Sequence, residues 1–296
     1  MTDKSMTSPS NAFMRPPASL SGPEARYAIL PIPYGGTVSY KGGTEDGPAQ
    51  ILDASEQVEW FDEELLAECV EAGIATHPPV PAQDSPELQM QRVREAAEPI
   101  VRAGKFLLSL GGEHSITAPL VEAVRQVHGP VSVLQIDAHA DLRDCYGGSP
   151  HSHACVMRRL MAISRGICQI GIRNVSLEEY RDCPRQVERF WTPAKIRATP
   201  DWIDQAIGML SPKVYLTIDI DGFDPAYAPG TGTPEPGGLD WLQVTGLLRE
   251  LCRRREVVAA DIIEVRPIPP NHVTEFLAAR LAYKIIAYTQ QPRDLT

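Results

Sequence analysis

The chain has 296 residues, of which 43% are hydrophobic and 22% charged, a composition typical of globular proteins. Its formal net charge of −10, without any basic cluster interleaved with aromatic residues, argues against a nucleic-acid partner. No run of about 18 apolar residues occurs, so the sequence predicts no membrane-spanning segment and no membrane partner.

The chain begins with a polar stretch. Residues 1–25 are rich in Pro and Ser and lack the apolar centre of a signal peptide, which predicts a flexible N-terminal arm. The six cysteines form no CxxC pair, and we expect them to be free thiols of a cytoplasmic protein. Since no linker or repeat divides the rest, we expect a single domain over 26–296.

Apolar runs and helical patterns then alternate along the chain. The runs are nearly continuous, as in parallel strands that are covered on both faces, and lie at 26–34, 105–114, 131–141, 167–173, 214–224 and 257–265. Amphipathic helical patterns follow at 86–104, 115–129, 201–210, 240–255 and 274–290. The alternation predicts a three-layer α/β/α fold around a central, mostly parallel, doubly wound sheet.

Several of these predicted strands end in acidic residues and histidines. In VLQIDAHADLRDCYGGSPHSHA, a strand continuing through Asp137, His139 and Asp141 would project all three side chains from one face, because side chains alternate with a period of two. Two carboxylates and an imidazole that are crowded together in this way require a cation. In an open parallel sheet, ligands bind beyond the carboxyl ends of the strands.

A second acidic pair, Asp219 and Asp221, follows the same spacing, and His114 follows a flexible Gly111-Gly112 turn. Four carboxylates and two imidazoles exceed a closed tetrahedral zinc site, so we expect two divalent cations, best matched by two Mn²⁺, with Ni²⁺, Co²⁺ or Fe²⁺ also compatible. Taken alone, the first motif also suits a solvated loop or one metal ion, and a DxD suits magnesium or sugar nucleotides. The conjunction of the three motifs favours the metal pair.

The motifs GGEHS (111–115), DAHAD (137–141), SHA (152–154) and DIDGFDPAYAPGTGTPEPGG (219–238) resemble, in order, those of the arginase/agmatinase (ureohydrolase) family. The resemblance extends from 31 to the final helix. It implies an arginase-like fold, a trimer or hexamer, and two manganese ions. One ion would bind His114, Asp137, Asp141 and Asp219, and the other Asp137, His139, Asp219 and Asp221.

The same resemblance implies hydrolysis of a guanidino group by a hydroxide that bridges the metals. His153 matches the histidine proposed to shuttle protons in the family, and a pKa near ~6.5 suits that task. Its neighbour His151 is the alternative. Glu264 would pair with the substrate guanidinium, although a structural pairing with Arg266 or Arg280 is the other reading.

The substrate is less strongly indicated. The loop around Arg143 resembles the agmatinase branch, which implies cleavage of agmatine to putrescine and urea, with Asp144 or Tyr146 as partners of the amine. Arg143 could instead hold the carboxylate of 4-guanidinobutanoate or 3-guanidinopropanoate. Arginase and guanidine hydrolase activities are further alternatives. Two further alternatives are not guanidino hydrolases: a single-zinc deacetylase-like enzyme and a metal-binding protein without activity.

Overall fold

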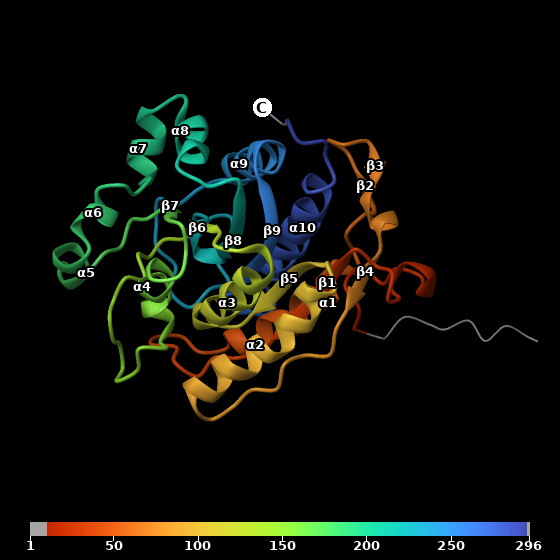
Figure 1. Ribbon diagram of the computed structural model, residues 1–296, viewed down its shortest axis with the longest axis horizontal. Helices are drawn as coiled ribbons and strands as arrows, with labels where there is room; N and C mark the ends of the chain where they lie inside the picture. The colour runs from red at the N-terminus through yellow and green to blue at the C-terminus, as the bar shows by residue number, and fades with distance from the viewer. Residues whose placement is uncertain (1–10, 295–296) are drawn as a thin grey trace, which may run out of the picture.

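The computed structural model describes residues 11–294. A seven-stranded, entirely parallel sheet forms its centre, in the order β4-β1-β5-β9-β8-β6-β7 (Figure 1). The strands are β1 (Tyr27–Ile32), β4 (Ile74–Thr76), β5 (Phe106–Gly111), β6 (Ser132–Ile136), β7 (Ile167–Ile170), β8 (Lys213–Asp219) and β9 (Glu256–Ile263). All six predicted strands are present, and β4 adds an edge strand that is too short to show a pattern.

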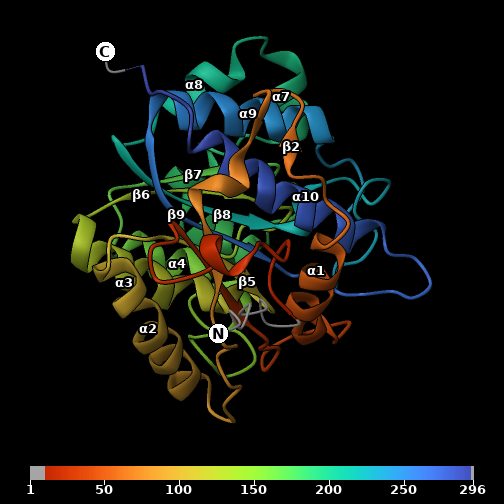
Figure 2. The same cartoon turned by 90° about the vertical axis from the view of Figure 1, so that its right-hand side faces the viewer.

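Helices cover both faces of the sheet (Figure 2). One face is covered by α1 (Gly47–Ser55), α9 (Trp241–Arg254) and α10 (Val273–Tyr288), and the other by α2 (Pro86–Arg102), α3 (Thr117–His128) and α4 (Val156–Met161). Between β7 and β8 the chain forms α5 (Leu177–Asp182), α6 (Pro184–Val187), α7 (Pro193–Ala198) and α8 (Trp202–Gly208). The predicted three-layer architecture is therefore confirmed.

Smaller elements complete the chain. An antiparallel pair of two-residue strands, β2 (Phe61–Asp62) and β3 (Ala67–Glu68), lies outside the main sheet. The 3₁₀ helices are η1 (Ala18–Leu20), η2 (Thr44–Asp46), η3 (Cys69–Ala72), η4 (His114–Ile116), η5 (His153–Cys155) and η6 (Ile220–Gly222). Within residues 11–294, no helix has the length and apolarity needed to cross a membrane.

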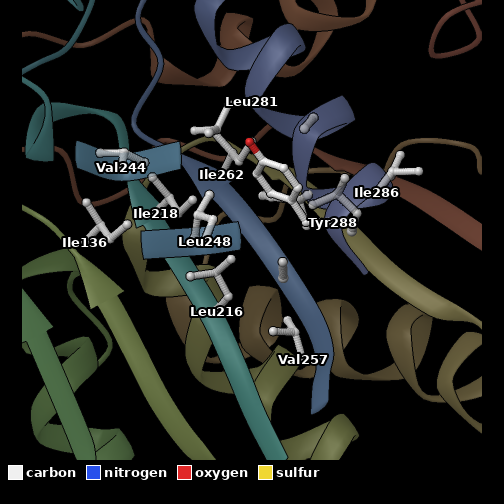
Figure 3. Packing of buried hydrophobic residues seen from close by; sticks show 14 of the residues in the cluster. Ile136, Leu216, Ile218, Val244, Leu248, Val257, Ile262, Leu281, Ile286 and Tyr288 are labelled. Atoms are coloured by element: carbon white, nitrogen blue, oxygen red, sulfur yellow. The ribbon is translucent and has the colours of Figure 1, made fainter. Parts of the chain in front are cut away.

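The sheet buries apolar side chains on both of its faces. Figure 3 shows Leu216 of β8 and Ile262 of β9 pointing toward Leu248 of α9 and Leu281 of α10. These four side chains are fully buried. Burial of a leucine or isoleucine stabilises a fold by ~1.5–3 kcal/mol, so this interface holds the central strands rigidly and fixes the position of their carboxyl ends.

The expected flexible arm does not extend to residue 25. Ala12, Phe13 and Met14 are buried, and the main-chain N–H groups of Phe13 and Met14 donate to Thr76 Oγ1 and Ser55 Oγ at 2.9 and 2.8 Å. In the sequence, the apolar triplet Ala12-Phe13-Met14 within a polar segment indicates this packing. The expected boundary at residue 26 is therefore too late, while residues 1–10 lie outside the described part.

Candidate active site

The predicted metal ligands meet at the carboxyl end of the sheet. Four adjacent strands, in the order β5-β9-β8-β6, deliver them and Glu264. His114 lies in η4 directly after β5, Asp137 follows β6, and Asp219 is the last residue of β8. The doubly wound topology thus brings residues that are about a hundred positions apart in the chain to one edge.

The prediction that a strand continues through residues 137–141 is wrong. Strand β6 ends at Ile136, so Asp137, His139 and Asp141 lie in the loop that follows rather than on one strand face. Asp141 has a left-handed backbone with a φ of +54°. The loop, rather than a strand, brings the three side chains to the carboxyl end of the sheet.

The second motif differs in a similar way. Asp219 ends β8, but Asp221 lies in η6, whose first turn is capped by a hydrogen bond from Asp221 N to Asp219 Oδ1 at 3.0 Å. A Cβ atom at Gly222 would lie 2.8 Å from Asp137 N. Only glycine allows η6 to approach the end of β6 this closely, and this approach brings the two acidic segments together.

Five of the six predicted ligands form two overlapping groups, and Asp141 lies beside His114 of the first group. His114 Nδ1 lies 2.9 Å from Asp141 Oδ2, 3.1 Å from Asp137 Oδ2 and 3.7 Å from Asp219 Oδ2. On the other side, His139 Nδ1 lies 3.0 Å from Asp221 Oδ2 and 3.6 Å from Asp137 Oδ1. Asp137 belongs to both groups, whose ligand atoms each lie within 4.8 Å of one another.

The orientation of His114 fits a metal ligand. Its Nε2 lies 3.0 Å from Thr217 Oγ1, whereas Nδ1 is buried and has no contact with the geometry of a hydrogen bond among the residues described. A nitrogen that faces several carboxylates without a hydrogen bond is arranged to share a cation with them. With imidazole and carboxylate donors only, the set is able to hold divalent metal ions.

The charges of the site also call for cations. Burial, together with Asp221 and Asp137, raises the pKa of Asp219 well above its usual value. Burial and Asp137 raise the pKa of Asp141 to about 7. Burial opposes the charging of His139, but Asp221 and Asp137 outweigh it and raise its pKa to about 12. Protons thus compensate the clustered carboxylates of the metal-free site, and metal binding would displace them.

Glu264 follows β9 with a φ of +61°. It lines a cavity of about 230 Å³, which the candidate metal ligands also line in part. Its Oε1 accepts a hydrogen bond from His114 N at 2.8 Å. The structural alternative is not seen in residues 11–294, since Arg266 donates to Gly42 O and Arg280 pairs with Glu63. Glu264 therefore lies beside the candidate metal ligand His114 and forms no ion pair with either arginine.

The two candidate histidines are separated by the structure. His153 lines the cavity, whereas His151 lines a different hollow, together with Glu87 and Arg94. His153 Nδ1 lies 3.2 Å from Thr37 Oγ1, whose hydrogen is donated to Glu113 Oε1 at 2.7 Å. The threonine oxygen can therefore only accept from the ring, which places the hydrogen on Nδ1 and the lone pair on Nε2.

The environment keeps the His153 ring neutral. Burial, followed by the charges of His114 and His139, lowers the pKa of His153 to about 4. Ser39 Oγ lies 3.4 Å from Nε2. At neutral pH the side chain is consequently able to take up a proton before it gives one away.

The predicted substrate loop is only partly in the cavity. Arg143 and Tyr146 line it, with the guanidinium of Arg143 5.0 Å from the centre of the Tyr146 ring. Arg143 Nη1 also lies 3.0 Å from Glu178 Oε2. Asp144 is not among the lining residues and pairs with Arg159, so it is not brought to the site.

Other lining residues were not predicted individually. They come from the loop after β1 (Val38, Ser39, Tyr40 and Lys41), the segment after β7 (Asn174, Ser176 and Glu179) and the loop after η6 (Gly232 and Thr233). Glu179 could have been predicted from the helix-start pattern Ser176-x-x-Glu179, which forms a capping box in the structure. Its Oε1 also accepts from Leu142 N at 2.9 Å, which holds the metal-ligand loop.

Comparisons with known proteins show the family of the chain. The family model described as "Arginase family" matches residues 25–287. The N(1)-aminopropylagmatine ureohydrolase of Synechocystis sp. is 40% identical over 292 residues, 95% of each chain. The agmatinase of Pyrococcus horikoshii is 34% identical over 268 residues, 89% of this chain and 92% of that one.

A solved structure extends the likeness to three dimensions. The agmatine ureohydrolase of Thermoplasma volcanium superimposes with a TM-score of 0.84 at 32% identity, covering 95% of this chain and 94% of that chain.

Proposed function

The chain belongs to the arginase family and is an agmatinase-type amidinohydrolase, and from this premise we propose that it hydrolyses the guanidino group of N(1)-aminopropylagmatine, with agmatine as the second candidate. Curated relatives with the longer substrate in their names are 35–40% identical, against 34% for the agmatinase of Pyrococcus horikoshii. The loop sequence predicts agmatine as the substrate, and the proposal now places a related, longer amine before it.

The observation that favours an amine over an acid is Glu179. This buried carboxylate lines the cavity outside the metal ligands and Glu264, and within residues 11–294 its oxygens accept from the main-chain N–H groups of Leu142 and Ser176 alone. It retains acceptor capacity for an ammonium group. Arg143, the residue that would hold a carboxylate, already has Glu178 as its partner at 3.0 Å. An amine at the distal end of the substrate therefore finds the better partner.

We propose two Mn²⁺ ions held by His114, Asp137, His139, Asp141, Asp219 and Asp221. When bound, such ions lower the pKa of water and so supply a nucleophile near neutral pH. The protein itself would orient the guanidinium, because the Glu264 carboxylate can accept two parallel N–H bonds from it. A plain ammonium lacks this planar pair of donors.

His153 would move the proton. Its neutral Nε2 takes up the proton released as water attacks the guanidinium carbon. The C–O bond forms, and the C–N bond to the alkyl chain breaks after His153 returns that proton to the leaving nitrogen. Water and the guanidinium are converted to urea and a protonated amine, with atoms and charge balanced.

The experiment is urea release by manganese-loaded protein from N(1)-aminopropylagmatine, agmatine, L-arginine, 4-guanidinobutanoate, 3-guanidinopropanoate and guanidine. We expect kcat/KM to be highest for the two amines. Preference for a guanidino acid would overturn the assignment and place its carboxylate on Arg143.

The histidines provide a matched pair of variants for the same assay. We expect His153→Ala to lower kcat by ~10²–10⁴-fold with metal content unchanged, and His151→Ala to behave as the unmodified protein. The reverse order would assign the proton transfer to His151.

A further inference from the structure

Three buried glutamines lie in a row beneath the metal-ligand loop. Gln135 is on β6, Gln169 on β7 and Gln186 on α6, and their exposed fractions are 0%, 0% and 8%. We propose that this row is a positioning relay that fixes the orientation of Asp137 and thereby sets the metal affinity of the site. The inference rests on the proposed metal site and deepens it.

The row is continuous from the outer helix to the ligand. Gln186 Nε2 donates to Gln169 Oε1 at 2.8 Å, and Gln169 Nε2 donates to Gln135 Oε1 at 2.6 Å. Gln135 Nε2 then donates to Asp137 Oδ2 at 2.7 Å. Gln135 and Gln169 are direct partners in the register of β6 and β7, so the sheet itself aligns the two amides.

The direction of the row is determined by groups that can only accept. Gln186 Nε2 also lies 3.2 Å from Ile167 O, and Gln169 Nε2 lies 2.9 Å from Ala140 O. At the far end, Gln135 Nε2 faces the carboxylate of Asp137. Reversing any amide would place oxygen against oxygen in a buried environment, which is unfavourable because each such group would lose its hydrogen bond without access to water. All three amides therefore direct N–H toward Asp137.

The relay acts on the residue that matters most to the site. Asp137 belongs to both groups of candidate ligands, so its rotation would disturb both cations. Its Oδ1 accepts from His139 N at 2.5 Å while Oδ2 accepts from Gln135, which leaves the carboxylate held on both oxygens. The bond from Gln169 to Ala140 O holds the loop between His139 and Asp141 as well.

If the row orients Asp137 and does not merely fill the core, a change at Gln186 should alter metal affinity although Gln186 is not next to a ligand. Gln186 does not contact Asp137 directly, yet without it Gln169 Oε1 loses the bond from Gln186, and that amide is held only through its Nε2 group. Partners in the outer shell of a metal typically contribute 10–100-fold to metal affinity, and hydrogen-bond chains strengthen one another.

The test measures Mn²⁺ dissociation constants by calorimetry on metal-free protein without substrate. Methionine replaces each glutamine because it is similar in length and lacks the amide. We expect Gln135→Met and Gln169→Met to weaken manganese binding ~10–100-fold and Gln186→Met to weaken it several-fold. The control is Gln89→Met in α2, a buried glutamine outside the row, for which we expect unchanged affinity.

The outcomes separate this inference from the proposed function. If the unmodified protein binds fewer than two ions, the metal-site proposal fails. If it binds two and the three relay variants bind as tightly, the relay is overturned. Weakening in Gln135→Met alone would reduce the row to one local contact and would also overturn it. Should Gln135→Met not fold, Gln186→Met at the outer end decides the question.

Discussion

Thr37 and His153 are joined twice through one oxygen atom. Thr37 Oγ1 accepts from His153 N at 3.1 Å and lies 3.2 Å from His153 Nδ1, while its own hydrogen is donated to Glu113. Glu113 comes from the turn after β5 and Thr37 from the loop after β1. The loops after two strands that are adjacent in the sheet thus hold the histidine through its main-chain N and its ring Nδ1.

We expect Thr37→Val to lower kcat by about fivefold, because the ring hydrogen loses its acceptor and one hydrogen bond is worth ~1 kcal/mol. Thr37→Ser, which keeps the hydroxyl, should restore most of the activity. Steady-state kinetics with metal analysis on the same samples checks this. An unchanged kcat in Thr37→Val, or loss of metal from it, would contradict the orienting role.

The proton state of His153 is a second prediction. Its pKa is lowered to about 4 by burial and by His114 and His139, so the ring should be neutral at pH 6 and become cationic only near pH 4. Imidazole ¹⁵N spectra of the metal-free protein, with His153→Ala for assignment, would report both charge and tautomer. We expect the hydrogen on Nδ1. An imidazolium signal at pH 6, or a hydrogen on Nε2, would refute the assignment.

Arg173 holds the loops that surround the site. Its guanidinium donates to the main-chain oxygens of Asp221, Phe223 and Glu235 at 2.7, 3.3 and 2.6 Å, and also to those of Gly171 and Pro236. An ammonium group cannot reproduce this planar set of donors. Arg173→Lys should therefore lower the free energy of unfolding by ~1.5–3 kcal/mol and weaken manganese binding.

Chemical denaturation and metal titration test the role of Arg173, with Arg181→Lys on the exposed helix α5 as the control. If Arg173→Lys were as stable as the control and bound manganese equally well, the loop would not depend on this clamp.

Glu264 is expected to act on substrate and not on metal. Glu264→Gln keeps an oxygen for His114 N but removes the charge that pairs with a guanidinium, a loss of ~1.5–3 kcal/mol or roughly 10–100-fold in kcat/KM. The matched control is Glu178→Gln, which changes the partner of Arg143. Unchanged kcat/KM in Glu264→Gln would exclude the pairing.

The main elements of the fold could be predicted from the sequence because its strands are buried on both faces. The runs 214–224 and 257–265 overlap all but the first residue of β8 and β9, and the helical pattern 86–104 contains α2, because long patterns are less affected by single residues. The short helices α5 to α7, with four to six residues each, show too little periodicity. Strand β4 has only three residues and depends on pairing with β1.

The sequence predicted which residues would lie close together at the sheet edge, but part of the geometric reason was wrong. Polar residues at strand ends indicate ligands, but Asp137, His139 and Asp141 lie beyond β6, where a close approach at Gly222 decides the geometry. Contacts across the sheet, such as Thr37 with His153 or Gln169 with Gln135, depend on strand order. Spacing along one chain does not encode that order.

The most direct test of the account is to add Mn²⁺ stepwise to metal-free protein while urea release from N(1)-aminopropylagmatine is measured. Five of the six proposed ligands form two groups that share Asp137, so the account predicts that activity rises until two equivalents per chain are bound and then stays constant. A plateau at one equivalent, or full activity in the metal-free protein, would contradict it.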